Sequence, residues 1–189
     1  MGPAHESVPT NPGLTAGPRA KLSPIAPTPE NPLWTFAVSL YERPGVRPAC
    51  LRLQDEVGLD VDVVLTILWI ARQGWACDAP TVRSLLAETA PIRAWIEGQR
   101  RHRRAANEHV HDDPGWRPVA DAALAAELAA ERYALHRSYG RVQALSLEKS
   151  TDRLEAARAG LTAYAKIMAI DGAAEAFAVL VSALAADLA

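Results

Sequence analysis

The sequence predicts an all-α fold, a single bundle of six or seven helices over residues 31–189. Three observations favour it. Apolar residues recur at helical spacing through residues 31–189, and capping residues and glycines stand where these apolar runs begin and end. No segment alternates apolar and polar residues as a half-buried strand does. The abundant alanine of the second half also favours helix.

Residues 1–30 form a segment of different composition. They contain seven of the 14 prolines and show no apolar period. Such a segment cannot bury enough apolar surface to offset the entropy that ordering costs. The sequence therefore predicts a disordered, proline-rich N-terminal leader, followed by one all-helical domain.

The first predicted helix begins at Asn31, a favourable N-cap, with Pro32 at the first helical position. The apolar residues of one face follow at helical spacing: Leu33, Phe36, Ala37, Leu40 and Tyr41. The triplet Arg43-Pro44-Gly45 should end this helix, because residues before proline avoid the α region and glycine turns freely.

The second helix should start near Pro48 and close at Gly58, which suits the C′ position. Asp60 should then cap a third helix that runs to about Gln73 and stops at Gly74. This third helix is apolar nearly all round, which is typical of a helix that others surround. We therefore expect it at the centre of the bundle.

The second half of the sequence predicts further helices. Asp78 or Thr81 should cap the first, and Pro91 should open another, in which Ile92, Trp95 and Ile96 face inward. After a turn at residues 112–115, a long helix should span about residues 119–147. Two alanine-rich helices, at about 151–169 and 172–187, should complete the bundle.

Several segments resemble one family. They read LWxFA from Leu33, YxRPGV from Tyr41, ACLxLQD from Ala49 and GLDV from Gly58, and the likeness continues to Trp69. This pattern resembles an uncharacterised proteobacterial family of small helical proteins, a domain of unknown function. The resemblance covers nearly all of the chain after residue 30, and it is looser in the second half. It implies an all-helical cytoplasmic protein, and it implies no activity, ligand or catalytic residue.

Composition excludes several classes of protein. A net charge of −2 provides no general attraction to nucleic acid or to anionic membranes. The longest strongly apolar run, residues 61–71, is shorter than the about 20 residues that span a bilayer. Cys50 and Cys77 lack the spacing of a zinc site or a redox pair, so we expect reduced thiols in a cytoplasmic protein. The common enzyme and cofactor motifs are missing from the sequence, so no cofactor is predicted.

The strongest functional signal is a local charge imbalance. Residues 81–104 contain six arginines against two glutamates, and residues 105–131 contain six acids against one arginine. A basic helix face can bind an acidic protein surface, and no aromatic residues interleave with the arginines as in single-strand nucleic-acid binding. If the two segments pack antiparallel, the charges instead neutralise one another within the molecule. The candidate partner-binding residues are Arg93, Arg100, Arg101, Arg103 and Arg104.

A second hypothesis places a pocket beside the first two helices, for a small apolar ligand or an unusual enzyme reaction. Its candidate residues are Trp34, Tyr41, Arg43, Cys50 and Gln54. The structural alternatives are a buried tryptophan, a small buried thiol, and an ion pair of Arg43 with Asp55 that holds the Pro44-Gly45 corner.

A third hypothesis is a metal site. His109, His111 and Asp113 are metal-ligand types close together in the sequence, and His109 and Asp113 would share a helix face. The cluster also lies beside Pro114-Gly115, where polar residues are expected at the end of a helix. Our leading sequence-based hypothesis remains a non-catalytic cytoplasmic interaction protein, whose oligomeric state the sequence leaves open.

Overall fold

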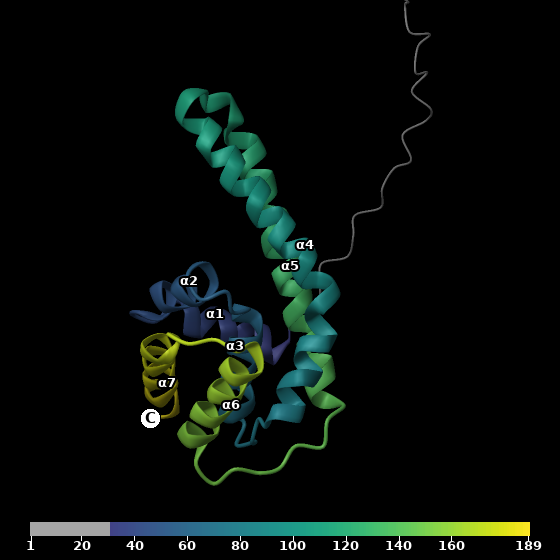
Figure 1. Ribbon diagram of the computed structural model, residues 1–189, viewed down its shortest axis with the longest axis vertical. Helices are drawn as coiled ribbons and strands as arrows, with labels where there is room; N and C mark the ends of the chain where they lie inside the picture. Colours follow the sequence, from purple (N-terminus) through teal and green to yellow (C-terminus); the bar gives the residue numbers. More distant parts are fainter. Residues whose placement is uncertain (1–30) are drawn as a thin grey trace, which may run out of the picture.

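The computed structural model describes residues 31–189, and this part of the chain is all-helical, as predicted (Figure 1). The predicted disordered leader, residues 1–30, lies outside the described residues. The elements are α1 (Pro32–Tyr41), α2 (Val46–Asp55), α3 (Val61–Arg72), α4 (Ala79–Asp112), the short 3-10 helix η1 (Pro114–Trp116), α5 (Arg117–Gln143), α6 (Arg153–Met168) and α7 (Ala174–Leu188).

Three of the predicted helix starts are confirmed by side-chain caps, whereas α2 begins at Val46, two residues before the predicted Pro48, and has no such cap. The Oδ1 atom of Asn31 accepts a hydrogen bond from the Trp34 amide at 3.0 Å, and Oδ1 of Asp60 accepts one from the Asp62 amide at 3.0 Å. Asp78, one of the two residues proposed to cap the fourth helix, accepts one from the Thr81 amide at 2.9 Å. These side chains satisfy amides that the first turn of a helix leaves without a partner.

The prediction that Pro91 opens a new helix is wrong. Helix α4 runs without interruption from Ala79 to Asp112, and Pro91 lies inside it. A proline within a helix removes one backbone hydrogen bond. Helix α5 packs along α4 more extensively than any other pair of helices in the described structure, and we attribute the persistence of α4 to this packing.

Helix α3 occupies the centre of the bundle, as its apolar sequence predicts. Residues 62–71 are all buried, and the helix contacts each of the other six α-helices. Tyr164 of α6 is buried against its start, where the Tyr164 hydroxyl accepts a hydrogen bond from the Asp60 amide at 2.9 Å. The start of α3 is therefore held in place both by its own cap, Asp60, and by Tyr164 of α6.

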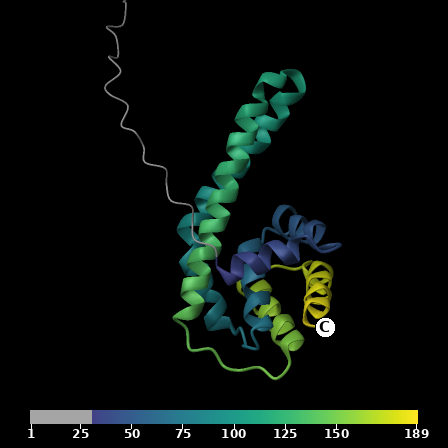
Figure 2. The same ribbon diagram turned by 180° about the vertical axis from the view of Figure 1, so that it is seen from behind.

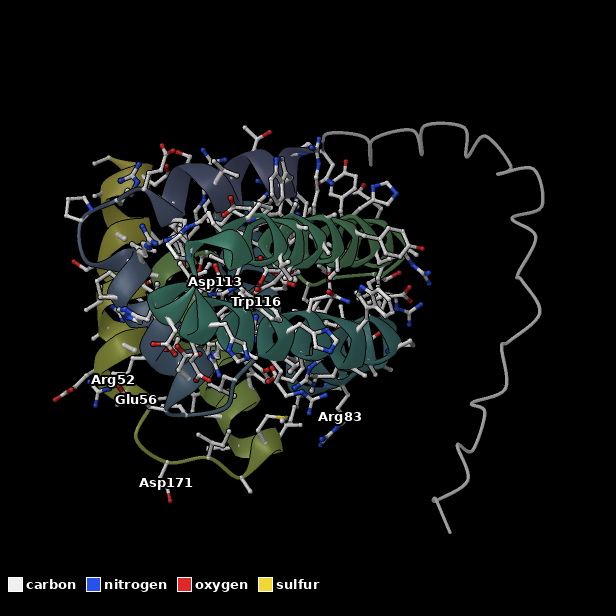
Figure 3. All side chains as sticks on the ribbon, turned by 90° about the horizontal axis from the view of Figure 1, so that it is seen from above. Arg52, Glu56, Arg83, Asp113, Trp116 and Asp171 are labelled. Carbon is white, nitrogen blue, oxygen red and sulfur yellow. The ribbon has the colours of Figure 1, made fainter. Side chains whose placement is uncertain are left out.

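Helices α4 and α5 form a hairpin that extends beyond the rest of the bundle. Both views show the two helices side by side, with α1, α2, α3, α6 and α7 gathered beside one end of the pair (Figures 1 and 2). Asp113 and Trp116 lie together at the turn of this hairpin (Figure 3). In the described part of the chain, no helix combines the length and the apolarity that crossing a bilayer requires.

Candidate functional site

A pocket of about 760 Å³ lies beside the start of α3, where α1, α2, α4 and α5 meet it. Its size falls within the range of about 300–1,000 Å³ that is typical of small-molecule sites. The pocket therefore has room for a ligand.

One part of the pocket is apolar. Its wall comes from α1, α3, α4 and α5, and it includes Trp34, Ala37, Leu65, Ile96, Leu128 and Leu135. Leu128 is 49 % exposed although it lines the pocket, and Val38, another lining residue, is 40 % exposed. Exposed aliphatic side chains that border a cavity are suited to bury an apolar molecule.

The other part of the pocket is lined by charged groups from three helices. Asp60 and Asp62 come from the start of α3, Arg93 and Arg100 from α4, and Glu131 from α5. The Arg93 Nε atom lies 3.0 Å from Oδ2 of Asp60. The N-terminus of α3 thus carries two carboxyl groups, of which one has an arginine partner.

Arg100 is the centre of a network that joins α4 to α5. Its guanidinium lies 3.0 Å from Glu97, 3.1 Å from Glu127 and 3.2 Å from Glu131. Glu127 is only 4 % exposed, and it also pairs with Arg103 at 2.6 Å. Each positive charge of this network therefore already has at least one carboxylate partner.

Asp62 differs from the other charged groups of the pocket. It is only 7 % exposed, and within residues 31–189 its carboxyl group makes no hydrogen bond or ion pair. Burial raises the pKa of Asp62 well above its ordinary value, and the nearby Asp60 and Glu131 raise it further. Asp62 is therefore the one buried acid of the pocket lining whose carboxyl group has no partner in the described residues.

The pKa values of the neighbouring acids move in the same direction. Burial raises the pKa of Asp60, although Arg93 opposes the shift. Burial and the charge of Glu127 raise the pKa of Glu131, while Arg100 lowers it. Acids with raised pKa values in a concave site are candidates for ligand binding or proton transfer.

We expect Asp62→Asn to stabilise the protein at alkaline pH. The folded-state pKa of Asp62 lies above its unfolded value, so the folded protein binds more protons between these two pKa values. Stability therefore falls as pH rises through this window. Urea denaturation should give the variant a free energy of unfolding about 1 kcal/mol higher than that of the wild type at about pH 8. The difference should shrink towards about pH 4.

Asp78→Asn is the matched control, since hydrogen bonds to Thr81 lower the pKa of Asp78. Its contribution to stability is present above the unfolded pKa and is lost as the pH falls. The two variants should therefore show opposite pH trends. A parallel pH trend for both aspartates would contradict the assignment of Asp62.

The structure brings together most of the residues predicted to form a pocket. Trp34, Tyr41, Cys50 and Gln54 all line it. Burial raises the pKa of the Cys50 thiol to about 12, which makes Cys50 a neutral group at physiological pH rather than a nucleophilic thiolate. The guanidinium of Arg132 lies 5.2 Å from the centre of the Trp34 ring.

Arg43 is not part of the pocket lining, and its expected ion pair with Asp55 is absent. Arg43 instead pairs with Asp187 of α7 at 2.7 Å, and Asp55 pairs with Arg104 of α4 at 2.6 Å. The prediction assumed that partners would be near in sequence. Packing of α7 against α1 and α2 supplies the partner of Arg43, and the side chain of Arg104 on α4 reaches Asp55 at the end of α2.

The candidate partner-binding arginines are mostly engaged within the molecule. Arg93, Arg100, Arg103 and Arg104 pair with acids of α2, α3, α4 or α5. Only Arg101 among the five is exposed with no ion pair to residues 31–189. Helices α4 and α5 pack antiparallel, the arrangement under which the sequence predicts mutual neutralisation of the two charged segments.

The candidate metal ligands do not converge. No group of three or more histidine, cysteine, aspartate or glutamate side chains in residues 31–189 is arranged to hold a metal. The His109 ring instead lies 4.6 Å from that of Trp116, and Asp113 accepts a hydrogen bond from the Gly115 amide at 2.8 Å. These contacts close the turn of the α4–α5 hairpin.

Sequence reasoning missed Asp62 and Glu131 and assigned Asp60 only to capping. A signal for Asp62 was present, because it is the one acid inside the otherwise apolar start of α3. Glu131 offered no such signal, since acids are common on long helices. One inward-facing residue was also wrongly predicted: Trp95 is 60 % exposed, whereas its neighbour Ile96 is buried.

The matching family model is described as protein of unknown function (DUF2390), and it covers residues 32–137. The chain therefore belongs to this family, which confirms the resemblance to a domain of unknown function. Comparison with curated proteins found no match, and comparison with solved structures found none either. Every residue that lines the pocket lies within the matched segment.

Proposed function

We propose that this member of the DUF2390 family binds a small molecule with an apolar body in the pocket beside the start of α3. One observation carries the proposal. A pocket of ligand size joins an apolar wall to Asp62, a buried carboxyl group without a partner in residues 31–189. Small-molecule sites typically combine an apolar lining with a few polar groups that orient the ligand.

The buried charge favours a binding role over a purely structural one. An unpaired carboxyl in the interior costs stability, and an apolar side chain at this position would avoid that cost. Asp62 is not needed to cap α3, because Asp60 accepts the hydrogen bond from the Asp62 amide. A bound molecule that contacts the carboxyl group would compensate for its burial.

The hypothesis of an acidic protein partner has less support. Four of its five arginines already pair with acids of the same molecule. A partner would have to compete with these ion pairs, whereas a pocket ligand would not. We also place the protein in the cytoplasm, because Cys50 and Cys77 are both free and buried, as thiols of a reducing compartment commonly are.

A fluorescence titration with N-phenyl-1-naphthylamine, an apolar dye that is uncharged at neutral pH, tests the proposal. We expect one dye to bind per chain, with enhanced emission as the dye leaves water. Leu128→Gln should weaken its binding about tenfold, because burial of a leucine side chain contributes about 1.5–3 kcal/mol and the polar replacement removes most of it.

Leu124→Gln is the matched control. Leu124 lies one turn earlier on α5 and is 41 % exposed, close to the 49 % of Leu128, but it does not line the pocket. This variant should bind the dye as the wild type does. Equal losses in both variants, or no binding by the wild type, would contradict the proposed function.

A further inference from the structure

We infer that the ligand is a small apolar amine whose ammonium group pairs with the carboxylate of Asp62. This inference rests on the proposed function, since it assigns the chemical class of the molecule in the same pocket. Of the buried or partly buried charged groups that line the pocket, Asp62 is the one without an ion pair within residues 31–189.

The pocket lining carries more negative than positive groups. Five acidic side chains face two arginines, and the sets are Glu42, Asp60, Asp62, Glu97 and Glu131 against Arg93 and Arg100. A charged ligand that reduces this imbalance must be a cation. An anion would meet the buried or partly buried carboxyl groups of Asp60, Asp62 and Glu131.

Neither arginine is available to receive an anionic ligand. Arg93 lies 3.0 Å from Asp60, and Arg100 lies between 3.0 and 3.2 Å from three glutamates. An incoming carboxylate or phosphate would have to displace one of these partners inside a partly desolvated site, which leaves another buried charge unpaired. The geometry therefore disfavours acids as ligands.

Asp62 provides the complementary group for a cation. Asp62 is only 7 % exposed and lines the pocket, and its carboxyl group has no partner within residues 31–189. An ammonium group carries only donors, and a charge-assisted hydrogen bond to a carboxylate is about twice as strong as a neutral one. A neutral alcohol of the same length can offer one donor and no charge.

Binding of an ammonium ion should release a proton. The raised pKa of Asp62 means that a fraction of the free protein carries the neutral acid, and the ammonium ion requires the carboxylate. The proton leaves the carboxyl oxygen for the buffer, and affinity should rise with pH until the amine itself deprotonates. The groups that interact electrostatically with Asp62 are Asp60 of the same turn, Arg100 of α4, Glu131 of α5 and Tyr164 of α6. The other titratable or charged groups of the pocket lining are Glu42, Tyr41, Cys50, Arg93 and Glu97.

Isothermal titration calorimetry of the full chain with octylamine, octanol and octanoate tests the inference. These probes share an eight-carbon body and differ in charge. We expect octylamine to bind at least about tenfold more tightly than octanol at neutral pH, with octanoate the weakest. Titrations of octylamine in two buffers of different ionisation enthalpy should reveal proton release, and octanol should show none.

Asp62→Asn is the diagnostic variant. It should abolish the preference for octylamine over octanol and the proton release, while octanol binding persists. Asp121→Asn is the matched control, because Asp121 is an exposed acid of α5 outside the pocket and its loss changes net charge equally. Thermal unfolding of both variants checks that they are folded.

The outcomes separate the two proposals. Binding of all three probes with equal affinity, or strongest binding of octanoate, would overturn the inference and leave the proposed function standing. A preference for octylamine that persists in Asp62→Asn would also overturn it. Failure of every probe to bind the wild type would contradict both the inference and the proposed function.

Discussion

Arg100→Ala is expected to lower the free energy of unfolding by about 3 kcal/mol, since it removes one member of a buried charge network and leaves others unpaired. Arg100 lies 3.1 Å from Glu127 and 3.2 Å from Glu131. Glu127 would keep Arg103, but Glu131 has no other ion pair in the described structure. Urea denaturation at neutral pH measures the loss.

The pH dependence identifies the cause of this loss. Arg100 lowers the pKa of Glu131 in the folded protein, so its removal raises that pKa further. The folded variant then binds more protons than its unfolded state above the ordinary pKa of a glutamate, and the destabilisation should grow as pH rises. Glu131→Gln in the Arg100→Ala background should recover part of the stability.

Arg101→Ala is the control for Arg100→Ala. Arg101 is the next residue of α4, and it is exposed with no ion pair to residues 31–189. Its replacement should change the free energy of unfolding by less than about 0.5 kcal/mol. Similar losses for the two arginines would show that the network around Arg100 does not stabilise the α4–α5 hairpin.

Gly160→Ala should destabilise the protein by about 2 kcal/mol, although alanine is the better helix former. Gly160 is buried where α6 crosses α3. A Cβ atom at this position would lie 2.7 Å from Cγ2 of Ile67, 3.1 Å from Cβ of Cys77 and 3.2 Å from the Cys77 carbonyl oxygen. The Cβ atom and the carbonyl oxygen of Cys77 cannot move without a shift of the backbone that follows α3.

Gly140→Ala tests the same replacement where space is available. Gly140 lies in α5, and a Cβ atom there would meet no atom within 4 Å. This variant should be more stable than the wild type by about 0.5–1 kcal/mol, because alanine loses less backbone entropy in a helix. A stabilising effect of Gly160→Ala would show that α6 and α3 are not packed as closely as described.

In the Ile67→Ala background, Gly160→Ala should lower the free energy of unfolding by a smaller amount, because the Cγ2 atom of Ile67, the nearest atom to the added Cβ, is absent. Calorimetric melting of the two single variants and the double variant measures this coupling. If the changes in the free energy of unfolding are purely additive, the added methyl group clashes with Cys77 and not with Ile67.

Much of the helix pattern could be predicted because its signals are local. Asn31 and Asp60 cap helices through hydrogen bonds that span two or three residues, and an apolar run on all sides of residues 61–72 places that helix in the interior. Pro91 shows the limit of local signals. Its lost hydrogen bond is a local cost, and packing of α4 against α5 outweighs it.

The pocket was only partly predictable for a related reason. Trp34, Tyr41 and Cys50 are near in sequence, so the sequence predicts them as one group, and all three line the pocket. Arg93, Arg100 and Glu131 reach the same cavity from helices distant in sequence. No periodicity indicates which face of a long polar helix will meet such a cavity.

The sequence by itself determined which segments are helical, where most of them begin and end, and which helix lies at the centre, because caps and apolar periodicity act over a few residues. Only the tertiary structure decided that most of the arginines of α4 are paired within the molecule and that Asp62 is buried without a partner in residues 31–189. The physical reason is that ion pairing and burial depend on distances between helices, which the order of residues along one helix does not specify.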